Sequence, residues 1–221
     1  MAAVRIVPQT ASEPDLSLER EQFAAGAQVI GAVDEVGRGS LAGPVSIGLV
    51  LLNSSFGAPP PGIRDSKQLS PAARADLAPQ IRKWALAALV AHASASEIDK
   101  HGIIAALRLA THRALAQVSR LHRVDVLLLD GSHDWLTGPA SMPRVVMQVK
   151  GDQTSIAIAA ASVIAKHERD LLMMELAPQH PEFGWERNKG YGSAEHMATL
   201  AERGLTKWHR RSYCNSFVEV H

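Results

Sequence analysis

Four carboxylates follow short apolar segments of the chain, and their spacing could support metal-dependent chemistry. The apolar segments are 29–33, 124–129 and 144–149, and the acids that follow them are Asp34, Glu35, Asp130 and Asp152. If the segments are strands, three strands deliver acids where they end, and ligand sites of α/β sheets gather at the carboxyl ends of strands. We therefore expect the four side chains to lie together.

Clustered carboxylates repel one another, which raises their pKa values unless a cation is bound. An all-oxygen ligand set suits Mg²⁺ or Mn²⁺ rather than zinc. Two such ions about 3.5–4 Å apart can hold the attacking water and the leaving oxygen of a phosphodiester. The alternative is that each acid is a helix cap or a surface loop residue. Asp152 precedes a predicted helix, where a carboxylate is stabilised without a metal.

Two short motifs near these acids each have two interpretations. Gly37-Arg38-Gly39 is a tight turn between strands, or a bare backbone that a sugar or phosphate can approach closely. Asp65-Ser66-Lys67 is a turn before the helix that Ser70 caps, or a place where Lys67 meets a phosphate. On spacing alone, the turn is the favoured interpretation of the second motif.

The segment 185–213 is a locally basic part of the chain. It holds six Lys or Arg residues and three acids, a net charge of +3, whereas the whole chain carries +1. Such a patch can steer a polyanion, but charge alone favours a solvated helical surface. Within the segment, 188–192 (NKGYG) brackets Tyr191 with glycines, so its ring could stack on a base or sugar or fill the core. The run 209–212 (HRRS) could grip phosphates or be surface charge.

The bulk composition is that of a packed globular protein. The chain has 221 residues, 46% of them hydrophobic and 20% charged, which predicts one domain, or one with an appendage. The single cysteine, Cys214, excludes an internal disulfide and a multi-cysteine zinc site. No secretory signal and no apolar run of about 18 residues is present. We therefore expect a cytoplasmic monomer that uses neither a membrane nor an organic cofactor.

Apolar periodicity and turn residues predict the order of the elements. Strands are expected at 29–33, 44–52, 84–92, 124–129 and 144–149, and helices at 16–27, 70–83, 103–121, 154–176 and 193–203, with a turn or short helix at 96–102. The order predicts a mixed α/β sheet with helices packed against it. The last forty or so residues add no clear strand and are expected to form a small helical appendage.

A series of motifs runs through the chain in a fixed order. They are 31–45 (GAVDEVGRGSLAGPV), 65–67 (DSK), 129–131 (LDG), 150–152 (KGD), 159–166 (AAASVIAK), 169–170 (RD), 189–192 (KGYG) and 209–212 (HRRS). Together they resemble the motifs of ribonuclease HII, the prokaryotic type 2 ribonuclease H. The resemblance covers about residues 29–212, and the combination is far more specific than any one motif.

The resemblance implies a ribonuclease-H-like sheet with a helical C-terminal part. We divide the chain into an N-terminal segment (1–28), a catalytic core (29–177) and a substrate-contacting region (178–221). The resemblance further implies that Asp34, Glu35, Asp130 and Asp152 bind Mn²⁺ or Mg²⁺. It implies that the 37–39 segment contacts the ribose 2′-hydroxyl, Lys67 a phosphate and Tyr191 the following deoxyribose. The expected substrate-binding set is Gly37, Arg38, Gly39, Ser66, Lys67, Lys189 and Tyr191.

The chain departs from the family pattern at a few positions. Ser40 stands where proline is common, Ala157 where serine is expected, and His167-Glu168 where valine and threonine are usual. None of these is one of the four acids. Because the last pair precedes Asp170, that residue is expected either to support the site from behind or only to pair with a basic neighbour.

The predicted activity is hydrolysis of the RNA strand of RNA–DNA hybrids and of duplex DNA that contains single ribonucleotides. Two Mg²⁺ or Mn²⁺ ions would give 5′-phosphate and 3′-hydroxyl ends. Three alternatives remain at this point. One is the sister enzyme ribonuclease HIII, for whose extra N-terminal domain the roughly 28 residues before the first strand leave no room. The others are a hybrid-binding module without activity and an α/β protein whose acids are only caps.

Overall fold

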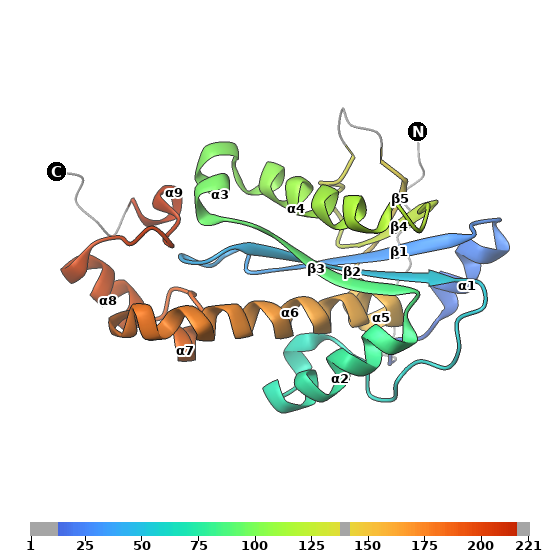
Figure 1. Ribbon diagram of the computed structural model, residues 1–221, viewed down its shortest axis with the longest axis horizontal. Helices are drawn as coiled ribbons and strands as arrows, with labels where there is room; N and C mark the ends of the chain where they lie inside the picture. The colour runs from blue at the N-terminus through green and yellow to red at the C-terminus, as the bar shows by residue number, and fades with distance from the viewer. Residues whose placement is uncertain (1–12, 138–141, 216–221) are drawn as a thin grey trace.

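The computed structural model describes residues 13–137 and 142–215, and a five-stranded sheet lies at its centre (Figure 1). The strands, in chain order, are β1 (Val29–Val36), β2 (Val45–Asn53), β3 (Ala87–Ala93), β4 (Val126–Asp130) and β5 (Arg144–Gln148). Their order in the sheet is β3-β2-β1-β4-β5. Because β1 pairs antiparallel with β2 and parallel with β4, the sheet is mixed, and the predicted fold class is confirmed.

Helices cover both faces of this sheet (Figure 1). The helices of the described residues are α1 (Ser17–Ala24), α2 (Pro71–Trp84), α3 (Ala95–His101), α4 (Ile103–Val118), α5 (Gly151–Thr154), α6 (Ile156–Leu176), α7 (Trp185–Asn188), α8 (Ala194–Arg203) and α9 (Arg211–Cys214). Three 3-10 turns are also present: η1 (Ser66–Gln68), η2 (Ala177–Gln179) and η3 (Pro181–Phe183). α2 and α6 lie against one face and α3 and α4 against the other. Side chains of β1 alternate between these layers: Ala32 packs on the α6 side, and Val33 on the α4 side.

The long helix α6 lies unusually close to β1 and β2. A Cβ atom built on Gly48 would stand 2.2 Å from the carbonyl oxygen of Ala161, so only glycine fits there. The alanines at 157, 159, 160 and 161 are fully buried and keep that helix face narrow. Gly48 pairs with Asp34 in the register of β1 and β2, so the close contact brings Asp34 beside α6.

The chain after α6 forms a third apolar cluster. Phe183 and Trp185 stack with ring centroids 5.5 Å apart, and Leu200 of α8 and Met173 of α6 are buried with them. Leu41, from the loop between β1 and β2, joins the same cluster. The C-terminal elements therefore pack on the loop that follows the first two acids, while the division of the chain at residue 177 stays a prediction.

Some predicted boundaries are wrong by a few residues for identifiable reasons. β1 continues to Val36, so Asp34 and Glu35 lie inside the strand rather than after it. The helix expected at 154–176 is α6, which begins two residues later, at Ile156, because Ser155 adopts an extended backbone and caps it, and the short helix α5 precedes it. Trp84 ends α2 instead of opening β3, and α4 stops at Val118. Residues 84–92 and 157–161 are rich in alanine, which occurs in both helices and strands. The spacing of apolar residues therefore indicates the element boundaries less clearly there.

Two findings bear on the expected surroundings of the protein. Within the described ranges, no helix is both long and apolar enough to cross a membrane. The single cysteine, Cys214, is buried in the third cluster, and burial raises the pKa of its thiol to about 11. The thiol is therefore protonated at neutral pH, which makes it a poor nucleophile and a poor metal ligand.

Candidate active site

Three neighbouring strands bring the four acids to the same edge of the sheet. Val33 of β1 pairs with Leu129 of β4. The next residue on each of these parallel strands is an acid, so Asp34 and Asp130 lie side by side. β5 lies next to β4, and after it the chain turns at Lys150, whose φ is +55°, into α5 with Asp152. Asp34 and Asp152 are buried, whereas Glu35 and Asp130 are half-buried.

The electrostatics of Asp34 show that the acids share one environment. Burial raises the pKa of Asp34 well above its usual value, and the charges of Glu35, Asp130 and Asp152 raise it further. The pKa values of Glu35 and Asp130 are also raised, mainly by burial. Repulsion and burial together make a metal-free cluster costly at neutral pH, which is the condition that a divalent cation relieves.

Asp130 and α5 are joined by a short hydrogen bond. The backbone N–H of Gly151 donates to Asp130 Oδ1 at 2.6 Å, and the N–H of Gly131 donates to the carbonyl of Gln148 at 2.9 Å. A Cβ atom on Gly151 would stand 2.5 Å from Ile158 Cδ1 and 3.2 Å from Asp130 Oδ1, so a side chain there would displace the end of Ile158 and crowd the Asp130 carboxylate. The glycine of the 150–152 motif thus fixes the position of Asp152 relative to Asp130.

Lys67 lies over Asp152 at the open side of the cluster. Its Nζ is 3.5 Å from Asp152 Oδ2 and 4.0 Å from Asp65 Oδ1, yet its side chain is 79% exposed. Burial opposes its charge, but the charges of Asp65, Asp152 and Asp34 outweigh that effect and raise its pKa. Lys67 is therefore charged, accessible and adjacent to the acids, as a phosphate contact requires.

Asp65 is a fifth acid of this site, which the sequence analysis treated only as part of a turn. It is buried, and its Oδ1 accepts from the N–H of Lys67 at 2.9 Å, so it does cap η1. Its charge also contributes to the raised pKa of Asp152, which is about 6. Asp65 thereby aligns Lys67 with Asp152 and adds to the negative potential.

The elevated pKa of Asp152 predicts a pH-dependent stability of the metal-free protein. The carboxyl group has an ordinary pKa of 3.8 and a folded value of about 6, so the folded state binds the proton more tightly. The stability that Asp152 contributes is complete below about pH 4 and is lost as the pH rises through about 6. In EDTA, Asp152→Asn should raise the urea midpoint at pH 7.5 and leave it nearly unchanged at pH 4. A midpoint unchanged at pH 7.5 would contradict the assigned electrostatics.

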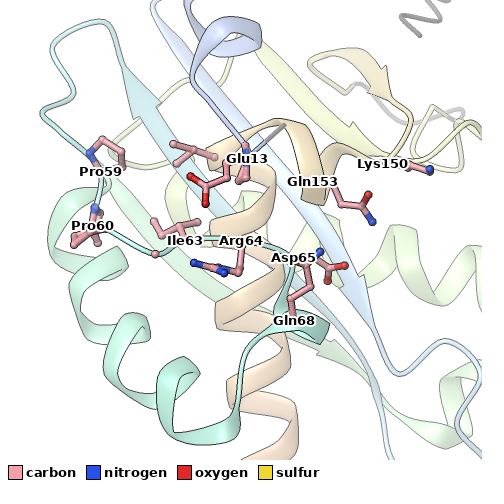
Figure 2. Close-up of a pocket in the computed structure, with 13 residues that line it drawn as sticks. Glu13, Pro59, Pro60, Ile63, Arg64, Asp65, Gln68, Lys150 and Gln153 are labelled. Atoms are coloured by element: carbon pink, nitrogen blue, oxygen red, sulfur yellow. The ribbon is translucent and has the colours of Figure 1, made fainter. Parts of the chain in front are cut away.

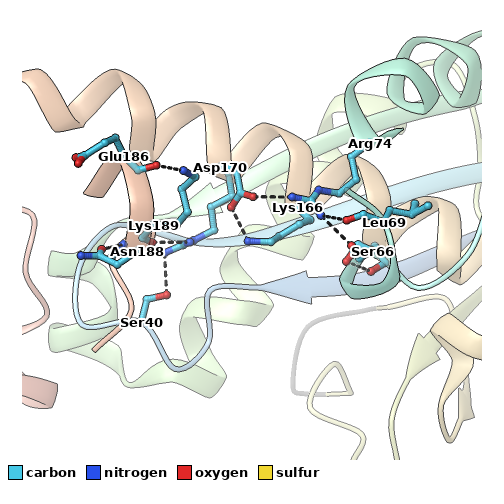
Figure 3. Close-up of polar contacts among 12 residues, drawn as sticks. Ser40, Ser66, Leu69, Arg74, Lys166, Asp170, Glu186, Asn188 and Lys189 are labelled. Atoms are coloured by element: carbon cyan, nitrogen blue, oxygen red, sulfur yellow. Dashed lines mark hydrogen bonds and ion pairs between the residues drawn. The ribbon is translucent and has the colours of Figure 1, made fainter. Parts of the chain in front are cut away.

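A hydrogen-bonded chain answers the open question about Asp170 (Figure 3). Asp170 pairs with Arg74 Nη2 at 3.2 Å and with Lys166 Nζ at 2.6 Å. Arg74 donates to the carbonyl oxygens of Ser66 and Leu69, at 3.0 and 2.6 Å. Asp170 therefore pairs with basic neighbours, and one of them holds the segment that carries Lys67.

Ser66, expected in the substrate-binding set, lies beneath the surface. It is 4% exposed, and its hydroxyl lies 2.8 Å from that of Ser162 on α6. Ser162 also interacts with Asp34 and lowers the pKa of that acid. In this structure, Ser66 joins α6 to η1 and leaves Lys67 as the exposed member of the motif.

Gly37 must be glycine because of a buried arginine. Its φ is +83°, and a Cβ atom there would stand 2.1 Å from Nε of Arg169. Nothing lies within 4 Å of a Cβ atom built on Gly39, so that side of the turn is open. Arg38 is 48% exposed and its Nη1 is 3.4 Å from Glu35 Oε1. The segment is thus a tight turn, and its outer side is also open to a ligand.

Two buried arginines hold this loop, and the sequence analysis missed their role. Arg169 donates to the carbonyls of Pro44, Ala42 and Lys189 and to the Ser40 hydroxyl, at 2.9–3.2 Å. The serine that replaces a common proline thus has a specific partner in this chain.

Arg210 is the second of these arginines. It donates to the carbonyls of Gly43, Arg38 and Gly37, at 3.1, 2.9 and 2.7 Å. Burial lowers its pKa to about 10. The suggestion that the 209–212 run grips phosphates or is surface charge is therefore wrong for Arg210, which is fully buried.

Tyr191 lies above Arg169, at the border of the loop. Its ring centroid is 5.4 Å from the guanidinium carbon of Arg169 and 5.9 Å from Lys166 Nζ. The residue is 37% exposed, so part of the ring faces solvent rather than the core. The backbone N–H of Leu41 donates to the carbonyl of Gly190 at 2.8 Å, which attaches the 189–192 motif to the loop after β1.

The basic segment offers less free charge than its composition suggests. Arg187 pairs with Glu186 and Glu195, and Arg203 pairs with Glu202. Lys189 Nζ donates to the carbonyl of Glu186 (Figure 3). The two histidines of the segment are buried, and burial lowers the pKa of His209 to about 3. They are therefore neutral parts of the third apolar cluster.

The donor set fits a hard divalent cation by its chemistry, although the side chains are not at ligand spacing. In the described part of the chain, no three Asp, Glu, His or Cys side chains are close enough to hold a metal ion. Arg38 contacts Glu35, Lys67 contacts Asp152, and the Gly151 N–H holds Asp130. Asp34, Glu35, Asp130 and Asp152 offer carboxylate oxygens, the ligands that Mg²⁺ and Mn²⁺ prefer, and their raised pKa values show that a nearby cation would stabilise their charged forms.

A pocket of about 550 Å³ lies on the side of α5 and is lined by Asp65 but by none of the four clustered acids (Figure 2). Arg64, Asp65 and Gln68 line it from the loop before α2, and Lys150 and Gln153 from the start of α5. Figure 2 shows Arg64 on the loop before α2 and Gln153 on α5. The pocket thus places two exposed cationic residues, Arg64 and Lys150, next to Asp65.

Comparison with known proteins decides the family. The family model described as Ribonuclease HII matches residues 30–216. This chain belongs to the ribonuclease HII family. The ribonuclease HII of Streptomyces avermitilis is 47% identical over 201 residues, which cover 90% of this chain and 83% of that protein. Family membership indicates a nuclease with ribonuclease H activity on RNA–DNA hybrids, so the hypothesis of an α/β protein whose acids are only caps is not supported.

Solved structures share the fold of this ribonuclease HII family member. Ribonuclease H2 from Pyrococcus horikoshii OT3 superposes with a TM-score of 0.65 and 23% identity, covering 83% of this chain and 93% of its own. Bst-RNase HIII in complex with Mn²⁺ superposes with a TM-score of 0.67 and 19% sequence identity. The match covers 95% of this chain and 74% of that structure's chain. Both have the ribonuclease-H-type sheet, and the family is metal-dependent.

Proposed function

We propose that this protein hydrolyses the RNA strand of RNA–DNA hybrids, including single ribonucleotides embedded in duplex DNA, and leaves 5′-phosphate and 3′-hydroxyl ends. The observation that carries the proposal is the set of acids on β1, β4 and α5, whose charges raise the pKa of one buried member. Asp34, Glu35, Asp130 and Asp152 would hold two Mn²⁺ or Mg²⁺ ions. Bound there, the ions would supply charge for the attacking water and the leaving oxygen.

The protein's own groups would position the substrate around that set. Lys67 is exposed beside Asp152 and suits a phosphate. The open turn at 37–39, fixed from below by Arg169 and Arg210, suits the ribose 2′-hydroxyl, the group that distinguishes RNA from DNA. The half-exposed Tyr191 suits the next deoxyribose. Ser66 and Lys189 would act mainly by shaping these segments, since the first is buried and the second is bonded to Glu186.

The pocket beside α5 extends the proposed path of the substrate. Arg64 and Lys150 form no ion pair with a carboxylate in the described ranges, so both are available to phosphates. Each phosphate contact to a duplex contributes about 0.9 to the slope of log affinity against log salt. The double substitution Arg64→Ala, Lys150→Ala should therefore weaken hybrid binding in EDTA and lower that slope by about 2.

The matched control for this salt dependence is Arg120→Ala, Arg123→Ala. Both side chains are exposed before β4, at the end of the strand opposite Asp130. The control should leave both affinity and slope unchanged. An equal loss of slope in the two double variants would remove the pocket from the substrate path and leave only general electrostatic attraction.

We further propose that the protein acts in the cytoplasm as a monomer. Its near-neutral charge of +1 and its single, buried cysteine support this proposal. The activity itself is tested with a labelled RNA–DNA hybrid in Mn²⁺, Mg²⁺ or EDTA. Cleavage of the RNA strand in either metal and none in EDTA is expected. Binding of hybrid without cleavage would favour a module that only binds, and cleavage in EDTA would contradict the role of the acids.

A further inference from the structure

Asp152 lies between the start of β5 and the start of α6, and the short helix α1 contacts the chain at both of these points. Glu19 and Gln22 are three residues apart and share one face of α1, and both are buried. Glu19 Oε1 accepts from the Ser155 hydroxyl at 2.6 Å and from the Ala157 N–H at 2.8 Å. Gln22 Oε1 accepts from Arg144 Nη2 at 2.7 Å. α1 thus joins the start of β5 to the start of α6, with Asp152 between them.

The residues just before α1 reinforce the same junction. Asp15 forms a parallel β-bridge with Ser155: its N–H donates to the carbonyl of Thr154 at 3.0 Å, and its carbonyl accepts from the N–H of Ile156 at 3.0 Å. Its side chain accepts from the N–H of Ser17 at 2.7 Å, which ties the bridge to the first turn of α1. The break between α5 and α6 is therefore held by backbone and side-chain bonds together.

The junction needs such support because its backbone is extended between two helices. Ser155 has φ −109° and ψ 123°, and its side chain accepts from the Ile158 N–H at 3.1 Å. α5 is only four residues long, and so short a helix does not hold its shape alone. Toward β4, α5 is attached by the bond from the Gly151 N–H to Asp130. Glu19 and Asp15 provide the attachment at its other end.

The buried carboxyl of Glu19 carries a cost that indicates a specific role. Its Oε2 has no hydrogen-bond partner in the described structure, and the residue is completely buried. A buried polar atom without a partner loses its bonds to water and gains none in return, which destabilises the fold. Burial raises the pKa of this carboxyl, partly offset by the bonds from Ser155 and Ala157. An apolar residue would avoid this cost, but it could not bond both groups at the start of α6.

We propose that Glu19, with Asp15, is a positioning residue for hydrolysis: it fixes the α5–α6 junction and thereby the place of Asp152 in the acid cluster. The inference rests on the proposed function. It concerns residues outside the family match, which begins at residue 30. Glu19 does not touch the substrate, so its loss should change the demand for metal and kcat while leaving KM for the hybrid unchanged.

The test compares Glu19→Ala and Glu19→Gln with a matched control. Glutamine retains the Oε1 acceptor, whereas alanine removes it. The control is Asp125→Ala, because Asp125 Oδ2 also accepts two backbone N–H groups, from Gln28 at 2.9 Å and Val29 at 3.1 Å, at the end of β1 remote from Asp34. Activities are corrected for the folded fraction measured by circular dichroism.

Glu19→Ala should raise the Mn²⁺ concentration for half-maximal activity about tenfold, the usual effect of losing a group that orients a ligand. It should also speed hydrogen exchange of the backbone amides of Gly151 to Ser155 in EDTA at least tenfold. This exchange measures the stability of the α5–α6 junction and does not depend on catalytic activity. Glu19→Gln should restore both, and Asp125→Ala should change neither. Exchange at wild-type rates in Glu19→Ala would overturn the proposal, even if its Tm fell.

Two further outcomes keep the inference separate from the proposed function. If Glu19→Ala does not fold, Ser155→Ala removes one of the two bonds and the cap of α6, and it should speed the same amides by a smaller factor. Protection at wild-type rates in that variant would also overturn the inference. If the wild-type protein does not cleave hybrids, the proposed function fails, while the exchange rates still report whether Glu19 holds the junction.

Discussion

Asp34→Asn should lower kcat for hybrid cleavage about a thousandfold in saturating Mn²⁺. The loss of one charged ligand removes about 4 kcal/mol of transition-state stabilisation, and each 1.4 kcal/mol is tenfold in rate. Asp34 is buried, and its burial and the charges of the other acids raise its pKa. Because asparagine keeps the shape but not the charge, the effect reports electrostatics rather than packing. Single-turnover cleavage at several Mn²⁺ concentrations is the measurement.

The same substitution should stabilise the metal-free protein. In EDTA at pH 7.5, asparagine removes the repulsion that raises the pKa of Asp34, so the urea midpoint should rise. Asp76→Asn is the control. Asp76 is exposed on α2, so this substitution makes the same chemical change at a surface away from the acid cluster. A variant that loses activity and stability together would instead mean that Asp34 has a structural role.

Arg169→Met should destabilise the fold by about 4 kcal/mol, because a charged donor to four oxygens is lost and those oxygens stay buried. Arg169 is completely buried and joins the carbonyls of Ala42 and Pro44 to that of Lys189. Methionine replaces the aliphatic part of the side chain but not the guanidinium, so the hydrogen bonds are lost together with the volume that the guanidinium fills. Urea unfolding in EDTA, followed by circular dichroism, measures the loss.

Arg187→Met is the matched control for this loss. Arg187 is exposed and pairs with Glu186 and Glu195, and such surface pairs contribute about 0–1 kcal/mol. Because Arg169 also lies under Gly37 and Tyr191, the remaining folded Arg169→Met protein should show a raised KM for substrates with a single ribonucleotide. A loss below 1 kcal/mol would show that the carbonyls find other partners.

The fold was largely predictable because its signals are local. The apolar runs of β2 and β4 and the serine caps of α2 and α8 are short-range patterns, and the structure has these elements within a few residues of their predicted bounds. The split between α5 and α6 was not predictable in this way. At Ser155, where the helix breaks, the chain is bonded to Asp15 and Glu19, which lie far away in the sequence.

The acids of the site were predictable in position, whereas the groups that hold them were not. Each of the four acids lies in the last residues of an apolar strand or shortly after it, and parallel pairing of β1, β4 and β5 brings those ends together. Arg210 lies in a run of basic residues that is typical of an exposed surface. Nothing nearby in the sequence indicates that it is buried beneath the 37–43 loop. Arg169 gives a weak signal, since a charged residue inside an alanine-rich helix must find partners when it is buried.

The measurement that tests the central claim most directly is cleavage of a duplex DNA that contains one labelled ribonucleotide, in Mn²⁺ and in EDTA. We predict a single cut on the 5′ side of the ribonucleotide in Mn²⁺, with a 3′-hydroxyl on one product and a 5′-phosphate on the other, and no cut in EDTA. Intact substrate in Mn²⁺, under conditions where longer hybrids are cleaved, would contradict recognition of a single 2′-hydroxyl by the 37–39 turn. Cleavage in EDTA would contradict the role assigned to the four acids.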